Sequence, residues 1–127
     1  MTLKEYQEKA MTTCLSSSRN PLYMLFMLGE EVGELQGKFS KAIRKGWITF
    51  VDNKFVVNKD KVNDEEIMKW LELVEKEMGD VLWGLAGLCE VLNWSLEEIG
   101  EINLEKLAAR KALGTIDGNG DGIVRGK

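Results

Sequence analysis

Apolar residues recur at helical spacing in four segments of the chain, and each segment has its own start signal. The first helix begins after Thr2, which forms a capping-box spacing with Glu5. The second is predicted from Pro21 to about Lys45, the third from Asp64 to about Leu92, and the fourth from Ser95 to Gly114. The second helix carries a predicted core stripe of Leu25, Leu28, Val32, Leu35, Phe39 and Ala42.

A change of pattern separates the second and third helices. Two runs of β-branched and aromatic residues flank a polar turn between Trp47 and Val57, which predicts a β-hairpin insertion at about 47–58. This hairpin is either a flap over a site or an edge used in self-association. We therefore expect an all-α, four-helix-bundle-type fold with one hairpin inserted. Residues 1–127 would form a single domain with a glycine-rich tail at 114–127.

The third predicted helix is apolar on nearly every face, with Leu85, Leu88 and Leu92 on one side and Trp83 and Ala86 on others. A helix of this kind needs more burial than a small single chain provides. We therefore expect a homo-oligomer.

Composition narrows the possible functions. The chain has 17 basic and 21 acidic residues, a formal net charge of −4, and the acidic residues are not blocked together. This argues against binding a nucleic-acid polymer or an anionic membrane. We expect a cytoplasmic protein, since no signal peptide or membrane-spanning run is present and Cys14 and Cys89 lie in apolar helical patterns.

The chain contains no histidine. This excludes the Ser-His and Cys-His nucleophile systems, the HExxH zinc sites and the Glu-x-x-His pairs of di-iron bundles.

An acidic pattern occurs twice. Glu31-Val32-Gly33-Glu34-Leu35 and Glu77-Met78-Gly79-Asp80-Val81 both read acid, apolar residue, glycine, acid, apolar residue. Residues three apart share a helix face, so the two segments could bring four carboxylates together. Such a cluster would need cations to offset its repulsion, and oxygen donors suit Mg²⁺ or Mn²⁺. The plainer alternative is solvated helix surface or salt bridges with neighbouring lysines.

Asn103, Lys106 and Arg110 fall on one stripe of the fourth helix. Two cations and an amide in this arrangement can bind an anionic group, although cations near a helix C-terminus also simply complement the helix dipole. The segment from Asp117 to Gly122 is similar to the opening of an EF-hand loop, but the chain ends before the twelfth position, where the bidentate glutamate belongs.

Taken together, these motifs resemble the MazG-like, all-α nucleoside triphosphate pyrophosphohydrolases. The resemblance rests on Glu30-Glu31-Val32-Gly33-Glu34, followed by Glu77-Met78-Gly79-Asp80 as an EExxE…ExxD signature. It extends to Asn103-Leu104-Glu105-Lys106-Leu107-Ala108-Ala109-Arg110 and to the ending Gly114…Gly120-Asp121…Arg125, which are typical of short phage and bacterial members. It covers nearly all of the chain except the hairpin.

The resemblance implies Mg²⁺-dependent hydrolysis of a (d)NTP to a nucleoside monophosphate and pyrophosphate, with Mn²⁺ as a possible substitute. It implies Glu31, Glu34, Glu77 and Asp80 as metal ligands. Glu30 would either support these ligands or activate the attacking water, so that Glu30, Glu31 and Glu34 are the expected catalytic residues. Lys106, Arg110 and Asn103 would hold the released diphosphate, and Lys38 and Arg125 would be further phosphate contacts. Base stacking would come from Trp83, Trp47 or Phe39.

The resemblance also implies a homodimer or homotetramer with a pocket shared between chains. The alternative function is a non-catalytic, metal-stabilised helical oligomer or a regulatory module that binds a nucleotide without cleaving it.

Overall fold

The computed structural model describes residues 1–116 of the 127-residue chain. Its elements are α1 (Leu3–Met11), a 3-10 turn η1 (Ser16–Ser18), α2 (Pro21–Arg44), β1 (Ile48–Val51), β2 (Lys54–Val57), α3 (Asp64–Val91) and α4 (Leu96–Leu113). The predicted all-α class with one inserted hairpin is therefore confirmed.

Local sequence signals place the helix ends. The Thr2 and Asn63 side chains each accept a hydrogen bond from the backbone of the residue three further on, and both positions form capping boxes. The Asn20 side chain caps α2 ahead of Pro21, and Gly114 ends α4 in the left-handed conformation, with φ 70°. In the hairpin, Asp52 and Asn53 both have positive φ, as a two-residue turn between twisted strands requires.

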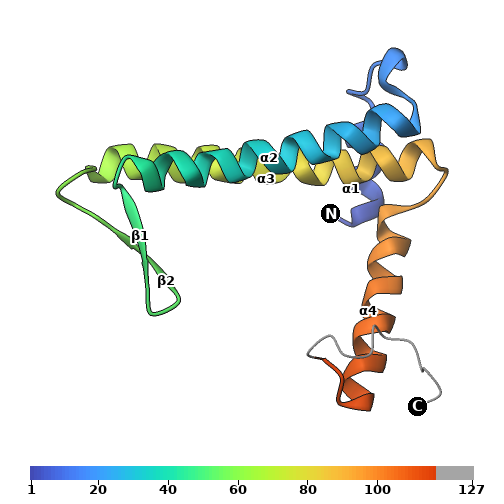
Figure 1. Ribbon diagram of the computed structural model, residues 1–127. Helices are drawn as coiled ribbons and strands as arrows, with labels where there is room; N and C mark the ends of the chain where they lie inside the picture. The colour runs from blue at the N-terminus through green and yellow to red at the C-terminus, as the bar shows by residue number, and fades with distance from the viewer. Residues whose placement is uncertain (117–127) are drawn as a thin grey trace.

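Two long helices form the centre of the molecule. α2 and α3 lie side by side over most of their length, the hairpin leaves one end of this pair, and α4 leaves the other (Figure 1). α1 packs on the C-terminal part of α3 and on the start of α4.

The buried apolar residues form two clusters, one near each end of the helix pair. At the α4 end the cluster comprises Met11, Ala86, Cys89 and Leu96. At the hairpin end it comprises Ala42, Ile48, Val62 and Ile67. The stretch of α2 and α3 between the clusters carries the two acidic segments.

Glycines in α3 allow α2 to approach closely. A Cβ at Gly87 would lie 2.6 Å from the sulfur of Met24, and one at Gly84 would lie 3.3 Å from a methyl carbon of Leu28. Met24 is fully buried as a result. At Gly79, in contrast, nothing lies within 4 Å of the Cβ position.

The predicted core stripe of α2 is partly wrong. Leu25 and Val32 are 54% and 37% exposed. The reason is that α2 packs mainly against α3, while α1 packs against α3 and α4, so a single neighbour covers only a narrow strip of α2. Many large apolar residues of α3 are exposed for the same reason, among them Met68, Leu71, Leu73, Met78 and Leu85. None of the helices within residues 1–116 combines the length and apolar composition needed to cross a lipid bilayer.

Candidate functional site

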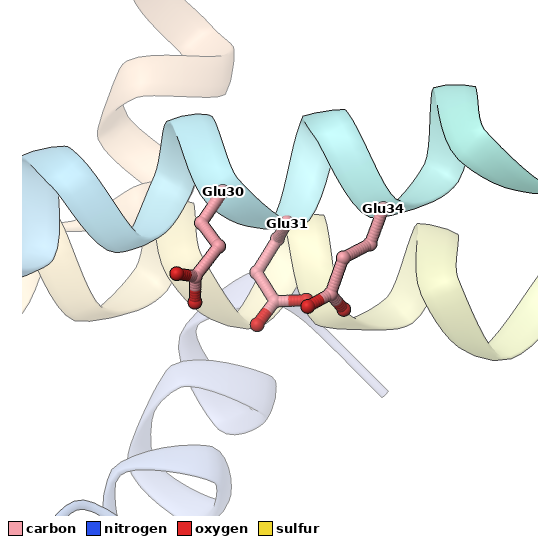
Figure 2. A group of neighbouring side chains, drawn as sticks. All are labelled: Glu30, Glu31 and Glu34. Atoms are coloured by element: carbon pink, nitrogen blue, oxygen red, sulfur yellow. The ribbon is translucent and has the colours of Figure 1, made fainter.

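Three carboxylates gather on one side of α2. Oxygen atoms of Glu30, Glu31 and Glu34 all lie within 4.8 Å of one another. Figure 2 shows the three side chains projecting from the same side of the helix, with the carboxylates of Glu31 and Glu34 close together. The three acids form one group because Glu34 follows Glu31 by three residues and Glu30 by four, the spacings of neighbours on a helix surface.

The facing helix adds two further carboxylates. Oxygen atoms of Glu31, Glu77 and Asp80 also lie within 4.8 Å of one another. Glu31 belongs to both groups and therefore joins the acids of α2 to those of α3. The structure brings together all four predicted metal ligands and Glu30.

Burial and the neighbouring carboxylates perturb the pKa of Glu31, the acid shared by the two groups. Burial, followed by the charges of Glu34 and Asp80, raises the pKa of Glu31 from its ordinary value of 4.5 to about 6. A hydrogen bond with Glu34 and the charge of Glu77 act in the same direction. Part of the Glu31 population therefore keeps its proton at mildly acidic pH unless a cation binds.

Two oxygen atoms in the cluster are buried without a protein partner. They are one carboxylate oxygen of Glu31 and one of Glu77. The other oxygen of Glu77 lies 3.9 Å from the Lys38 ammonium, a long ion pair. Buried unpaired carboxylate oxygens are costly, and a hard divalent cation is the partner that oxygen-only donors prefer. The donor set therefore fits Mg²⁺ or Mn²⁺.

The remaining predicted residues lie in different places. Lys38 lies beside Glu77, as its spacing from Glu31 and Glu34 suggested. Trp83 packs against the cluster at the α4 end, and its indole N–H donates to the Ala10 carbonyl and the Thr13 hydroxyl at 3.2 and 3.0 Å. Its nitrogen is thus engaged by the segment around α1.

Asn103, Lys106 and Arg110 lie on α4, which points away from the α2–α3 pair (Figure 1). A single chain therefore does not place these three residues beside the carboxylates. Arg125 and the Asp117–Gly122 segment lie outside the described residues.

The surroundings of the acids include two residues outside the predicted site, Lys41 and Tyr6. Lys41 lines a hollow of about 230 Å³ with Glu34, Gly37, Lys38 and Glu77. The sequence spacing indicates that Lys41 lies on the same side of the helix as Glu34, because it follows Glu34 by seven residues, about two helical turns. Tyr6 of α1 had no such signal. Burial and the nearby charge of Asp80 raise the pKa of its hydroxyl, which shows that α1 borders the site.

The model of the MazG nucleotide pyrophosphohydrolase domain matches residues 19–113, a range that includes α2, the hairpin, α3 and α4. The Gene 37 protein of Mycobacterium phage L5 is 31% identical over 99 residues, which cover 78% of this chain and 73% of that protein. No solved structure matches at a significant level.

Proposed function

Because the chain belongs to the family of MazG nucleotide pyrophosphohydrolase domains, we propose that it hydrolyses nucleoside triphosphates, ribo or deoxy, in the presence of Mg²⁺. The bond broken joins the α-phosphorus to the oxygen that bridges to the β-phosphate. Water supplies the new oxygen on the α-phosphorus, pyrophosphate leaves, and the products are a nucleoside monophosphate and pyrophosphate. Mn²⁺ would substitute for Mg²⁺.

The observation that carries this proposal is the convergence of five carboxylates with two buried, unpartnered oxygens. Glu31, Glu34, Glu77 and Asp80 would hold the cation. When bound, Mg²⁺ neutralises phosphate charge and stabilises the charge that develops on the leaving oxygen.

Glu30 would orient the attacking water and accept its proton. It is exposed at the edge of the carboxylate cluster, so its oxygens can face a water molecule rather than the interior of the cluster. Glu31 and Glu34, which neighbour it, would contribute to catalysis by fixing the position of the cation.

Phosphate contacts would come from Lys38 and, in an assembled protein, from α4. The apolar faces that α2 and α3 leave exposed favour a homodimer or homotetramer. In such an assembly, Asn103, Lys106 and Arg110 of one copy would reach the carboxylates of another and hold the diphosphate. Arg125 would add a further phosphate contact.

The test is incubation of the purified protein with each common NTP and dNTP plus Mg²⁺, followed by separation of products. Release of a monophosphate and pyrophosphate supports the proposal. Glu34→Gln and Asp80→Asn should each abolish release, whereas Glu72→Gln, at an exposed position of α3, should not. Circular dichroism and oligomer size should be normal in all three variants.

Full activity in Glu34→Gln or Asp80→Asn would refute the assignment of the site. Saturable nucleotide binding without turnover in the wild-type protein would favour the non-catalytic module instead.

A further inference from the structure

The hairpin is anchored to both long helices by a chain of aromatic rings. The ring centroid of Phe55 in β2 lies 5.4 Å from that of Phe39 in α2, and Phe39 lies 5.1 Å from Trp70 of α3 in an edge-to-face arrangement. Such ring pairs contribute beyond the area they bury. The hairpin base is therefore a packed part of the molecule.

Trp47 occupies the joint between α2 and this hairpin. Its N–H donates to the Ala42 carbonyl at 2.9 Å, and its carbonyl accepts from the Asn58 N–H at 2.8 Å. Both the end of α2 and the exit of β2 thus fix the backbone at Trp47.

Beside Trp47 lies a cavity of about 260 Å³. Its apolar lining comprises Ala42, Trp47, Trp70 and Leu73, and its charged lining comprises Lys38, Lys41, Lys45, Glu66 and Lys69. The Trp70 indole N–H donates to the Lys38 carbonyl at 3.0 Å, which fixes the orientation of that ring. The Trp70 ring is therefore held in place on α3 before any ligand arrives, and Trp47 lines the same cavity from the turn between α2 and β1.

The lysines of this cavity differ in how they are engaged. Lys45 lies over the Trp47 ring, 4.8 Å from its centroid, and Lys69 pairs with Glu65 at 3.2 Å. Lys38 and Lys41, in contrast, also line the hollow that contains Glu34 and Glu77. Lys38 and Lys41 therefore place positive charge between the aromatic cavity and the carboxylate cluster.

The spacing of the two regions matches a nucleotide. Trp70 precedes Glu77 by seven residues, and Lys41 follows Glu34 by the same number. Seven residues correspond to about 10 Å along a helix, comparable with the span from a nucleobase to its α-phosphate.

We propose that the cavity between Trp47 and Trp70 is the subsite for the nucleobase of the substrate. Lys38 and Lys41 contact the α-phosphate, which stays with the nucleoside, and the β- and γ-phosphates extend beyond the carboxylates. The inference rests on the proposed function and adds the direction in which the nucleotide lies. A nucleobase is the occupant that the chemistry favours, because flat apolar rings line the cavity and its cations continue toward the phosphate side.

Binding measurements test this directly. The ligands are the α,β-methylene analogues of the common nucleoside triphosphates, which cannot be cleaved between these phosphates, and inorganic triphosphate, which has no base. Both are titrated in Mg²⁺ into the full-length protein by calorimetry. Trp47→Leu should weaken analogue binding about fivefold to 150-fold, the equivalent of ~1–3 kcal/mol for one stacked base, and leave inorganic triphosphate unchanged.

Three further variants sharpen the result. Trp47→Phe should recover part of the lost affinity, because it restores an aromatic face. Leu73→Trp should also weaken the analogue, because it fills the cavity from a position that is 44% exposed and tolerant of change. Trp94→Leu, at a 57% exposed position in the turn before α4, is the matched control and should bind both ligands normally.

The proposal is overturned if Trp47→Leu and Leu73→Trp bind the analogues as Trp94→Leu does, or if either weakens the analogue and inorganic triphosphate equally. It is also overturned if no analogue binds the wild-type protein. Because these titrations measure binding alone, a protein that binds analogues through Trp47 but releases no pyrophosphate would refute the proposed function and leave the nucleobase subsite standing.

Discussion

Replacing Glu31 with glutamine should stabilise the metal-free protein at neutral pH while it removes cation binding. In the folded protein the pKa of Glu31 is raised from 4.5 to about 6. The folded state therefore holds this proton more tightly than the unfolded state does. As pH rises from about 4.5 through 6, the folded protein must give up a proton that the unfolded chain has already lost, so its stability falls.

The magnitude follows from the shift. A difference of about 1.5 pH units corresponds to ~2 kcal/mol at 1.36 kcal/mol per unit, and partial solvent screening lowers the expectation to about 1–2 kcal/mol. Glutamine stays neutral throughout. The stability of Glu31→Gln relative to the wild type should therefore rise by about 1–2 kcal/mol between pH 4.5 and pH 7.5.

Urea unfolding followed by circular dichroism, in EDTA and at one protein concentration, measures this difference at pH 4.5, 6 and 7.5. Glu72→Gln is the control, and its difference from the wild type should not change with pH. Mg²⁺ at about 100 times its dissociation constant should add ~2.7 kcal/mol to the wild type and little to Glu31→Gln. A Glu31→Gln difference that stays constant with pH, or falls as pH rises, would refute the reasoning.

Four other substitutions test the packing and charge of the molecule. Gly87→Ala should cost about 1–3 kcal/mol in urea unfolding, because its Cβ would lie 2.6 Å from the Met24 sulfur. Gly79→Ala, with open space around its Cβ, should be neutral or stabilising by up to ~1 kcal/mol, and equal losses at both glycines would contradict the packing described. Lys38→Met should change the free energy of unfolding by less than ~1 kcal/mol, because the Lys38–Glu77 ion pair is long. The same substitution should raise the KM for nucleotide. An unchanged KM would exclude Lys38 from phosphate binding. Gln7→Leu should lower the free energy of unfolding by about 1–3 kcal/mol, measured by thermal or urea unfolding. The reason is that this buried side chain forms hydrogen bonds with Glu90, the Trp94 carbonyl and the Leu96 N–H. An unchanged stability would show that these bonds do not anchor α4.

The exposed apolar surface bears on how the protein works in solution. Phe26 and Leu22, near the start of α2, are 70% and 65% exposed. Several large apolar residues of α3 are exposed as well. Surfaces of this kind are characteristic of chains that associate. Sedimentation at several concentrations would show whether assembly and pyrophosphate release rise together, as expected if α4 of one copy completes the site of another.

Local sequence patterns determined much of this protein. Helix starts at Thr2, Asn20, Asn63 and Ser95 could be predicted, because a cap depends on side chains within three residues of the backbone groups they satisfy. The pairing of Glu31 and Glu34 with Glu77 and Asp80 was predictable for a related reason. Helical spacing fixes which residues share a face, and the acidic pattern occurs on both helices.

Only the tertiary structure decided where the helices lie relative to one another. No local sequence pattern predicts that α1 crosses α3, which brings Tyr6 near Asp80. No local pattern predicts that α4 carries Lys106 and Arg110 away from the carboxylates of its own chain. The cavity between Trp47 and Trp70 depends on the same long-range packing, because its walls come from α3, α2 and the turn after α2, and no sequence period encodes the contact between the two helices. Spacing along one helix is set by backbone hydrogen bonds, whereas the placement of one helix on another is set by side-chain packing across the whole fold.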